Sequence, residues 1–148
     1  MRTPIMDVET TANCTCLNLR KASRAVTQFY DEAFKPVGLR VTQFSLLALV
    51  ANKGPAGMKE LAKFLVMDRT TLTRNLKPLI DQGFLVVIKS DDRRQRPIAI
   101  TSRGRNRLAQ ALPLWREAQN RVVANLGRET WVGLLQSLSA TVSATTHE

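Results

Sequence analysis

Residues 90–97, SDDRRQRP, concentrate charge at one point of the chain. Two acids and three arginines stand between the apolar runs LVVIK and IAITS, which are rich in β-branched residues and predict a hairpin. An arginine-rich hairpin tip can pair with phosphates or enter a DNA minor groove, whose negative potential attracts a guanidinium. Taken alone, this segment is better explained as a charged, solvent-exposed hairpin turn with no further role. The neighbouring elements must decide between these interpretations.

The thiols of Cys14 and Cys16 are the second group that could do chemistry. A thiol near a helix N-terminus, with Arg20 four residues beyond Cys16, has two influences that favour the nucleophilic thiolate. Oxidation would pass through a sulfenic acid to a disulfide, including one with a thiol of another molecule. Cysteine also packs as a small hydrophobe in interfaces. Both interpretations stand for Cys16, whereas packing or exposure is favoured for Cys14.

Neither a metal site nor a catalytic site is expected. Two thiolates from each chain could meet across a dimer, but no further ligand lies nearby in the sequence, and the only histidine, His147, is in the C-terminal tail. The sequence offers no Ser-His-Asp set, no glycine-rich phosphate loop and no paired carboxylates in an apolar setting. We therefore expect no enzyme, no cofactor and no bound metal.

Two short helices are predicted immediately before the hairpin. MKELAKFL is amphipathic, and DRTTLTRNLKPLIDQG follows with Asp68 as N-cap and Gly83 as C-cap. Pro78 removes one backbone hydrogen bond inside the second helix. Two short helices joined by a tight connection are typical of a helix-turn-helix.

The outward face of that second helix suits a DNA major groove. With its leucines on the core face, short hydroxyls and cations point away, so Arg74 could read a guanine and Lys77 could pair with a phosphate. An ordinary solvated face is the alternative, but the preceding helix and the following hairpin favour DNA. In the hairpin we expect Asp92 to orient Arg94 by a hydrogen bond. The predicted DNA contacts are Arg69, Thr70, Thr71, Thr73, Arg74 and Lys77 on the helix, and Asp92, Arg93, Arg94 and Arg96 in the hairpin.

The remaining elements are helical. Residues 1–13 are polar and without periodicity, which predicts a flexible arm, and residues 14–148 are expected to form a single domain. Its fold class is mostly α with a small β-hairpin wing: a winged helix-turn-helix over about 42–103 and helices over about 15–36 and 104–146. The last two helices carry apolar stripes with no further partner in the sequence, which indicates association with another chain.

Composition and charge agree with a nucleic-acid partner. The 148 residues are 44% hydrophobic and 23% charged, as in a globular protein, with a formal net charge of +10. Residues 58–107 hold 12 Lys/Arg against 5 Asp/Glu, a net charge of +7, whereas residues 108–148 hold 3 against 3. No secretory signal or membrane-spanning run is apparent, so we expect no membrane partner and a cytoplasmic location.

The run MKELAKFLVMDRTTLTRNLKPLIDQGFLVVIKSDDRRQRPIAITSRG resembles the winged helix-turn-helix core of the MarR family of transcriptional regulators. The likeness includes a D-x-R-R wing and a T-x-x-G step into the next helix, and it extends over residues 15–146. It implies a homodimer, formed by the first and the last two helices, that binds double-stranded DNA at a pseudo-palindromic operator, usually as a repressor. Reading helices about one DNA turn apart would follow. Small phenolic or aromatic acids are implied as ligands.

CTCLNLRKASRAVTQFYDEAFKPVGLRVTQF is similar to the first-helix region of the hydroperoxide-sensing branch of that family. The resemblance places Cys16 at the reactive cysteine and Tyr30 at one of the tyrosines that hold it, while Arg20 replaces the other tyrosine. Cys16, Cys14, Tyr30 and Arg20 are therefore the candidate redox site.

The sequence thus predicts a DNA-binding transcriptional regulator, expected to be a repressor released by an oxidant or a small aromatic ligand. Two other classes remain open. One is an architectural protein that binds DNA without regard to sequence, which would share the basic hairpin. The other is a small thiol-dependent enzyme with Cys16 as its nucleophile.

Overall fold

A computed structural model describes residues 8–92 and 94–146. Most of the chain is helical, and a single hairpin supplies both strands of the one sheet seen in the described residues. In chain order the elements are α1 (Val8–Ala12), α2 (Thr15–Phe34), the short 3-10 helix η1 (Lys35–Val37), α3 (Val41–Lys53), α4 (Met58–Leu65), α5 (Arg69–Asp81), β1 (Leu85–Val87), β2 (Ile98–Ile100), α6 (Ser102–Leu126) and α7 (Arg128–Thr145). The predicted fold class is confirmed.

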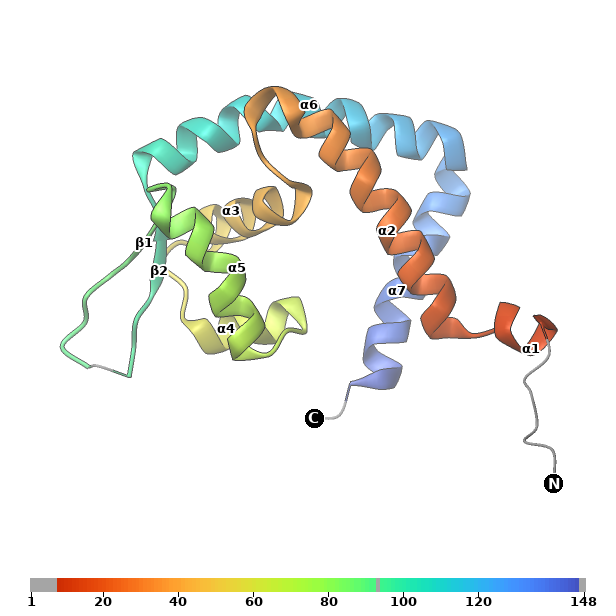
Figure 1. Ribbon diagram of the computed structural model, residues 1–148, viewed down its shortest axis with the longest axis horizontal. Coiled ribbons are helices and arrows are strands. Elements are labelled where there is room, and N and C mark those ends of the chain that lie inside the picture. The colour runs from red at the N-terminus through yellow and green to blue at the C-terminus, as the bar shows by residue number, and fades with distance from the viewer. Residues whose placement is uncertain (1–7, 93, 147–148) are drawn as a thin grey trace.

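The elements form an arch that is spanned by α6 (Figure 1). The helices α3, α4 and α5 and the hairpin lie below the N-terminal end of α6, while α2 and α7 descend from its other half. The small residues Ala111 and Ala118 are buried on α6, the helix against which α2 packs. The arch therefore separates a winged helix-turn-helix from a pair of long helices.

One continuous core joins the two halves of the arch. Phe34 of α2 stacks on Phe44 of α3, with ring centroids 4.9 Å apart, and Phe44 in turn stacks on Trp115 of α6 at 6.1 Å. Because these three rings come from three helices, they fix the winged helix-turn-helix relative to α2 and α6. The fully buried leucines of α3, α4 and α5 continue this core below them: Leu47, Leu61, Leu72 and Leu79.

The two ends of α5 follow the local sequence signals. Asp68 is the N-cap, as predicted, and its carboxylate accepts the backbone N–H of Thr71 at 2.8 Å. At the other end the C-cap is Gln82, one residue before the predicted Gly83, which follows with φ 76°, a left-handed conformation that favours glycine. Pro78 is accommodated inside the helix.

The hairpin is anchored to the helices on both sides. Its strands pair antiparallel, with Leu85 opposite Ile100. Ile98 also exchanges two backbone hydrogen bonds with Ala56, which lies two residues before α4, at 2.8 and 2.9 Å. Beyond β2, the Thr101 hydroxyl donates to the carbonyl of Gly83 at 2.6 Å and accepts the N–H of Gly104 at 3.0 Å. The predicted T-x-x-G step thus ties the end of α5 to the start of α6.

At the N-terminal end the structure differs from the prediction. Residues 8–12 were expected within an arm without secondary structure, but they form α1. The side-chain amide of Asn18 explains the difference, since it donates to the carbonyls of Ala12 at 2.7 Å and Cys14 at 2.9 Å and so links the end of α1 to α2.

The pair of long helices leaves large apolar side chains uncovered. None of the described residues of α7 is buried, and the large apolar side chains of Leu134, Leu135 and Val142 on this helix are exposed. On α2, Leu19 and Val26 are also exposed. Within the described residues no single helix is both long and apolar enough to cross a bilayer; α2 and α3 meet that test only together, as a pair bent by 75°.

Candidate nucleic-acid interface

The predicted DNA contacts of α5 lie on its outward side, which we call the reading face. Leu72, Leu76 and Leu79 are buried beneath it. Five of the six predicted contact residues are exposed, namely Arg69, Thr70, Thr73, Arg74 and Lys77, whereas Thr71 is half-buried. The helix therefore presents two arginines, a lysine and short hydroxyls on the side away from the core.

Two of the hydroxyls are already engaged. The Thr71 hydroxyl donates to the Asp68 carboxylate at 2.7 Å, and the Thr73 hydroxyl donates to the carbonyl of Arg69 at 2.8 Å. Together the backbone N–H and the hydroxyl of Thr71 lower the pKa of Asp68. Thr71 therefore stabilises the start of α5, and Thr70 is the threonine hydroxyl of this turn left for an external acceptor.

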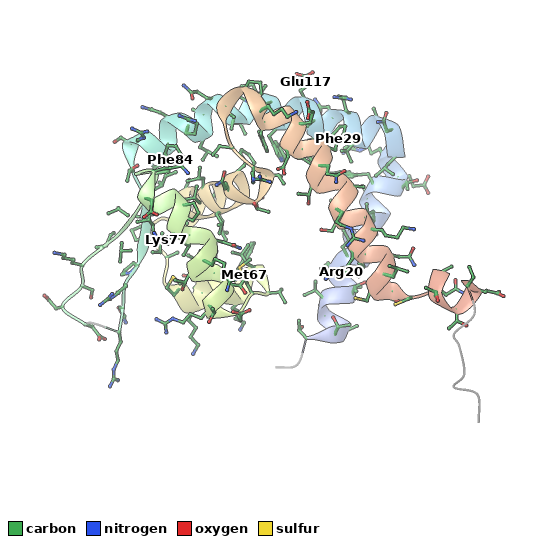
Figure 2. All side chains as sticks on the ribbon, viewed as in Figure 1. Arg20, Phe29, Met67, Lys77, Phe84 and Glu117 are labelled. Carbon is green, nitrogen blue, oxygen red and sulfur yellow. The ribbon has the colours of Figure 1, made fainter. Side chains whose placement is uncertain are left out.

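Lys77 marks the other end of the reading face (Figure 2). Its ammonium lies 2.6 Å from the Asp81 carboxylate, one turn further along α5, and both side chains are largely exposed. An exposed pair of this kind contributes little to stability and is easily exchanged for a phosphate. Lys77 can therefore bind a phosphate after leaving Asp81.

The hairpin tip corrects one prediction. Asp92 was expected to orient the Arg94 guanidinium, but in the described residues its carboxylate accepts the backbone N–H of Arg94 at 2.9 Å, while its carbonyl accepts the N–H of Gln95 at 2.9 Å. An aspartate two residues before an N–H closes the local turn readily, which explains the difference. Arg94 and Arg96 are exposed, and Arg93 lies outside the described residues.

A cleft joins the reading helix to the hairpin. Its volume is about 840 Å³, and it opens between the N-terminal ends of α4 and α5 and the second half of the hairpin loop. Sequence reasoning missed two of its cations, Lys59 and Lys63, which read as the polar face of an amphipathic helix. The charged residues that line it are Lys59, Glu60, Lys63, Arg69, Arg94 and Arg96. Five cations against one acid make the cleft attractive to a polyanion.

The candidate redox residues do not come together within the chain. Cys14 is the N-cap of α2 and Cys16 lies in its first turn, and both thiols are exposed. Tyr30 is buried near the other end of α2, roughly 21 Å along the helix axis from Cys16. Its hydroxyl donates to the side chain of Gln119 on α6, and burial raises its pKa. Arg20 is exposed on α2 (Figure 2).

The aromatic residues divide between core and surface. Phe34 and Phe44 are buried, so they support the helices rather than line an open cavity. Phe29 borders a hollow of about 600 Å³ between α2 and α6, where the Arg121 guanidinium lies 4.9 Å from its ring centre. No group of three or more His, Cys, Asp or Glu side chains that could hold a metal ion gathers among the described residues.

A helix-turn-helix, an adjoining two-stranded wing and a basic cleft between them define a winged-helix protein with a nucleic-acid-binding face. Residues 39–95 match the model of the MarR family. The solved DNA complex of the transcriptional regulator MosR from M. tuberculosis is 39% identical, with a TM-score of 0.74, and the match covers 87% of this chain and 98% of MosR. The chain belongs to the MarR family of transcriptional regulators.

Two other regulators are similar to this chain, one in structure and one in sequence. The transcriptional repressor CouR, bound to a 23-mer DNA duplex, has a TM-score of 0.79 at 27% identity, covering 94% of this chain and 99% of CouR. CouR has also been solved with p-coumaroyl-CoA. The HTH-type regulator YwoH of Bacillus subtilis is 26% identical over 83 residues, which span 56% of this chain and 61% of YwoH, less than two thirds of that relative.

Proposed function

We propose that this chain is a homodimeric, sequence-specific DNA-binding regulator that represses transcription by occupying an operator. The observation that carries the proposal is the shared cleft: Arg69 of the reading helix and Arg94 and Arg96 of the wing line one basic surface. A helix in the major groove and a wing over the adjacent backbone would use that surface together. The similarity to CouR, a transcriptional repressor solved on a DNA duplex, supports the same mode of action.

Base reading is assigned to α5 and backbone contact to the wing. Arg74 is exposed on the outward face of α5, where its guanidinium can make a bidentate contact with guanine. Thr70 precedes it by about one turn and has its hydroxyl available. Arg94 follows the turn closed by Asp92 and reaches toward the minor groove. Arg93 belongs to the same proposed contact.

Dimerisation is assigned to α2, α6 and α7. Leu134, Leu135 and Val142 on α7, and Leu19 and Val26 on α2, leave an apolar surface that a second copy would cover. The zero net charge of residues 108–148 fits a buried interface better than a DNA contact. A twofold axis through these helices would present two copies of α5 to a pseudo-palindromic operator.

Release from DNA is assigned to an oxidant or a small aromatic ligand. Both thiols are exposed at the start of α2, so a hydroperoxide can reach Cys16 and convert it to a sulfenic acid, which a second thiol resolves to a disulfide. The p-coumaroyl-CoA bound to CouR supports the ligand alternative. Either effector must favour one of two helix spacings to shift the equilibrium.

The test is fluorescence anisotropy with a labelled duplex from upstream of the gene that encodes this chain. A scrambled duplex at the same salt concentration is the control, and both are measured before and after mild hydroperoxide treatment. Selective binding that is lost on oxidation and restored by thiol supports a redox-controlled repressor. Selective binding that ignores the oxidant assigns release to a ligand. Equal affinity for both duplexes contradicts the regulator and favours an architectural DNA-binding protein.

We propose also that the protein is cytoplasmic and is not an enzyme. Cys16 would need a nearby base to act as a catalytic nucleophile. Arg20, the exposed charged residue four positions after Cys16, is a cation and cannot accept a proton. Turnover of a thiol-reactive substrate in the absence of DNA would contradict this part of the proposal.

A further inference from the structure

The cleft between α4 and the wing contains cations that the reading of α5 does not use. Lys59 and Lys63 are one helical turn apart on α4, both are exposed, and both line the cleft together with Arg96. The start of α4 is fixed against the hairpin, because the backbone N–H and carbonyl of Ala56 both form hydrogen bonds with the backbone of Ile98. The two lysines therefore hold a set position relative to the wing.

Among the described residues, Glu60 is the one acid that lines this cleft. Its carboxylate is 3.0 Å from the ammonium of Lys53, the last residue of α3. That ammonium also lies 5.3 Å from the ring centre of Phe64 on α4, which gives it a second favourable contact. Lys53 itself does not line the cleft. Its ammonium is thus held where it cancels the acid that would repel a phosphate.

We propose that this cleft is a channel for the phosphodiester backbone of DNA, in which Lys59 and Lys63 bind phosphates and Lys53 acts as a positioning residue by neutralising Glu60. The inference rests on the proposed DNA-binding function and extends it to α4. The backbone enters at the N-terminal end of α5 and leaves beneath the wing arginines. Contacts of this kind fix register and carry no sequence information.

The cleft cations predict a measurable salt dependence. The slope of log K against log salt concentration is negative, and each phosphate contact adds about 0.9 to its magnitude. Loss of one contact in both chains of a dimer therefore lowers that magnitude by about 1.8. At 0.15 M salt the same relation gives about fivefold lower affinity for each contact and about thirtyfold for the pair. Lys59→Ala and Lys63→Ala should each show this loss. Both should weaken operator and scrambled duplexes by the same factor.

The role of Lys53 is tested by a double-mutant cycle with Glu60. Lys53→Met leaves the acid uncompensated and should weaken DNA binding, whereas Glu60→Gln should strengthen it. In the Glu60→Gln background, Lys53→Met should have no further effect. Lys35→Met is the matched control, because Lys35 forms an exposed ion pair with Glu32 in α2 outside the cleft. It removes the same charge and should change DNA affinity by less than twofold.

The measurements are anisotropy titrations of the full chain on both duplexes between 50 and 250 mM KCl, with circular dichroism to verify folding of each variant. An unchanged salt slope in Lys59→Ala and Lys63→Ala overturns the phosphate channel. If Lys53→Met lowers DNA affinity by the same factor in the unmodified chain and in the Glu60→Gln variant, the neutralising role of Lys53 is overturned. Selectivity of the unmodified chain for the operator tests the proposed function separately, since the channel contributes equally to both duplexes.

Discussion

Gly104 is the position where one added methyl group should disturb both the wing and α6. A Cβ built there would lie 2.2 Å from the carbonyl oxygen of Phe84 and 2.8 Å from a side-chain carbon of Ile100. The Phe84 carbonyl cannot retreat freely, because it accepts the N–H of Thr101 at 3.0 Å and its ring is buried. Gly104→Ala must therefore displace backbone.

The magnitude follows from two opposing effects. Alanine favours a helix over glycine by about 1 kcal/mol, whereas overpacking costs about 1–3 kcal/mol and reaches the upper end when the obstacle is backbone. The expected net loss is about 2 kcal/mol. For a chain of 148 residues, unfolding entropy of about 2.1 cal/mol/K per residue converts this to a melting temperature roughly 6 °C lower.

The assay is thermal unfolding followed by circular dichroism at one fixed protein concentration, since the stability of a dimer depends on concentration. Asn106→Ala is the control, because Asn106 is exposed on the same helix and the change raises helix propensity without a clash. It should leave the melting temperature unchanged or slightly higher. A Gly104→Ala variant that melts at or above the temperature of the unmodified chain would refute the close approach as a constraint.

Three further predictions concern the DNA-binding face and the thiols. Arg94→Ala should weaken binding to all duplexes, while Arg74→Ala should also relax base preference at one position of each half-site by about 1–3 kcal/mol; anisotropy on single-base operator variants would show unchanged discrimination if the faces are misassigned. Hydrogen bonds from Thr71 lower the pKa of the Asp68 carboxyl in the folded chain. The cap therefore stabilises the fold at pH values above the unfolded pKa, and this stabilisation is lost as the pH falls through the lower folded pKa. An NMR titration midpoint of Asp68 at or above the ordinary value would contradict the cap. Cys16→Ser should abolish the response of DNA binding to hydroperoxide, whereas a response retained in Cys16→Ser and lost in Cys14→Ser would move the sensor to Cys14.

The elements of the DNA-binding half could be predicted because their signals are local. Asp68 and Gly83 mark the ends of α5 by side-chain capping and by a left-handed backbone. Spacing of the leucines then determines which side of α5 is buried, and therefore that Arg74 points outward. The β-branched runs around SDDRRQRP similarly determine the hairpin.

Short-range competition limited the prediction at the hairpin tip and at the N-terminus. The sequence identified Asp92 as a partner of Arg94, but the nearer backbone N–H takes the carboxylate. Periodicity gave no sign of α1, because a single turn of helix is too short to show a repeat and depends on the Asn18 amide beyond it.

The sequence by itself determined the family, the outward face of α5 and the charge of the wing, since each depends on residue patterns along continuous segments of the chain. Tertiary structure alone decided which distant groups meet. The pairing of Ala56 with Ile98 brings the α4 lysines beside the wing arginines and creates the cleft. Packing of α2 on α6 likewise gives the Tyr30 hydroxyl to Gln119 instead of a thiol. Such contacts depend on how helices pack in three dimensions, which hydrophobic spacing along one segment does not specify.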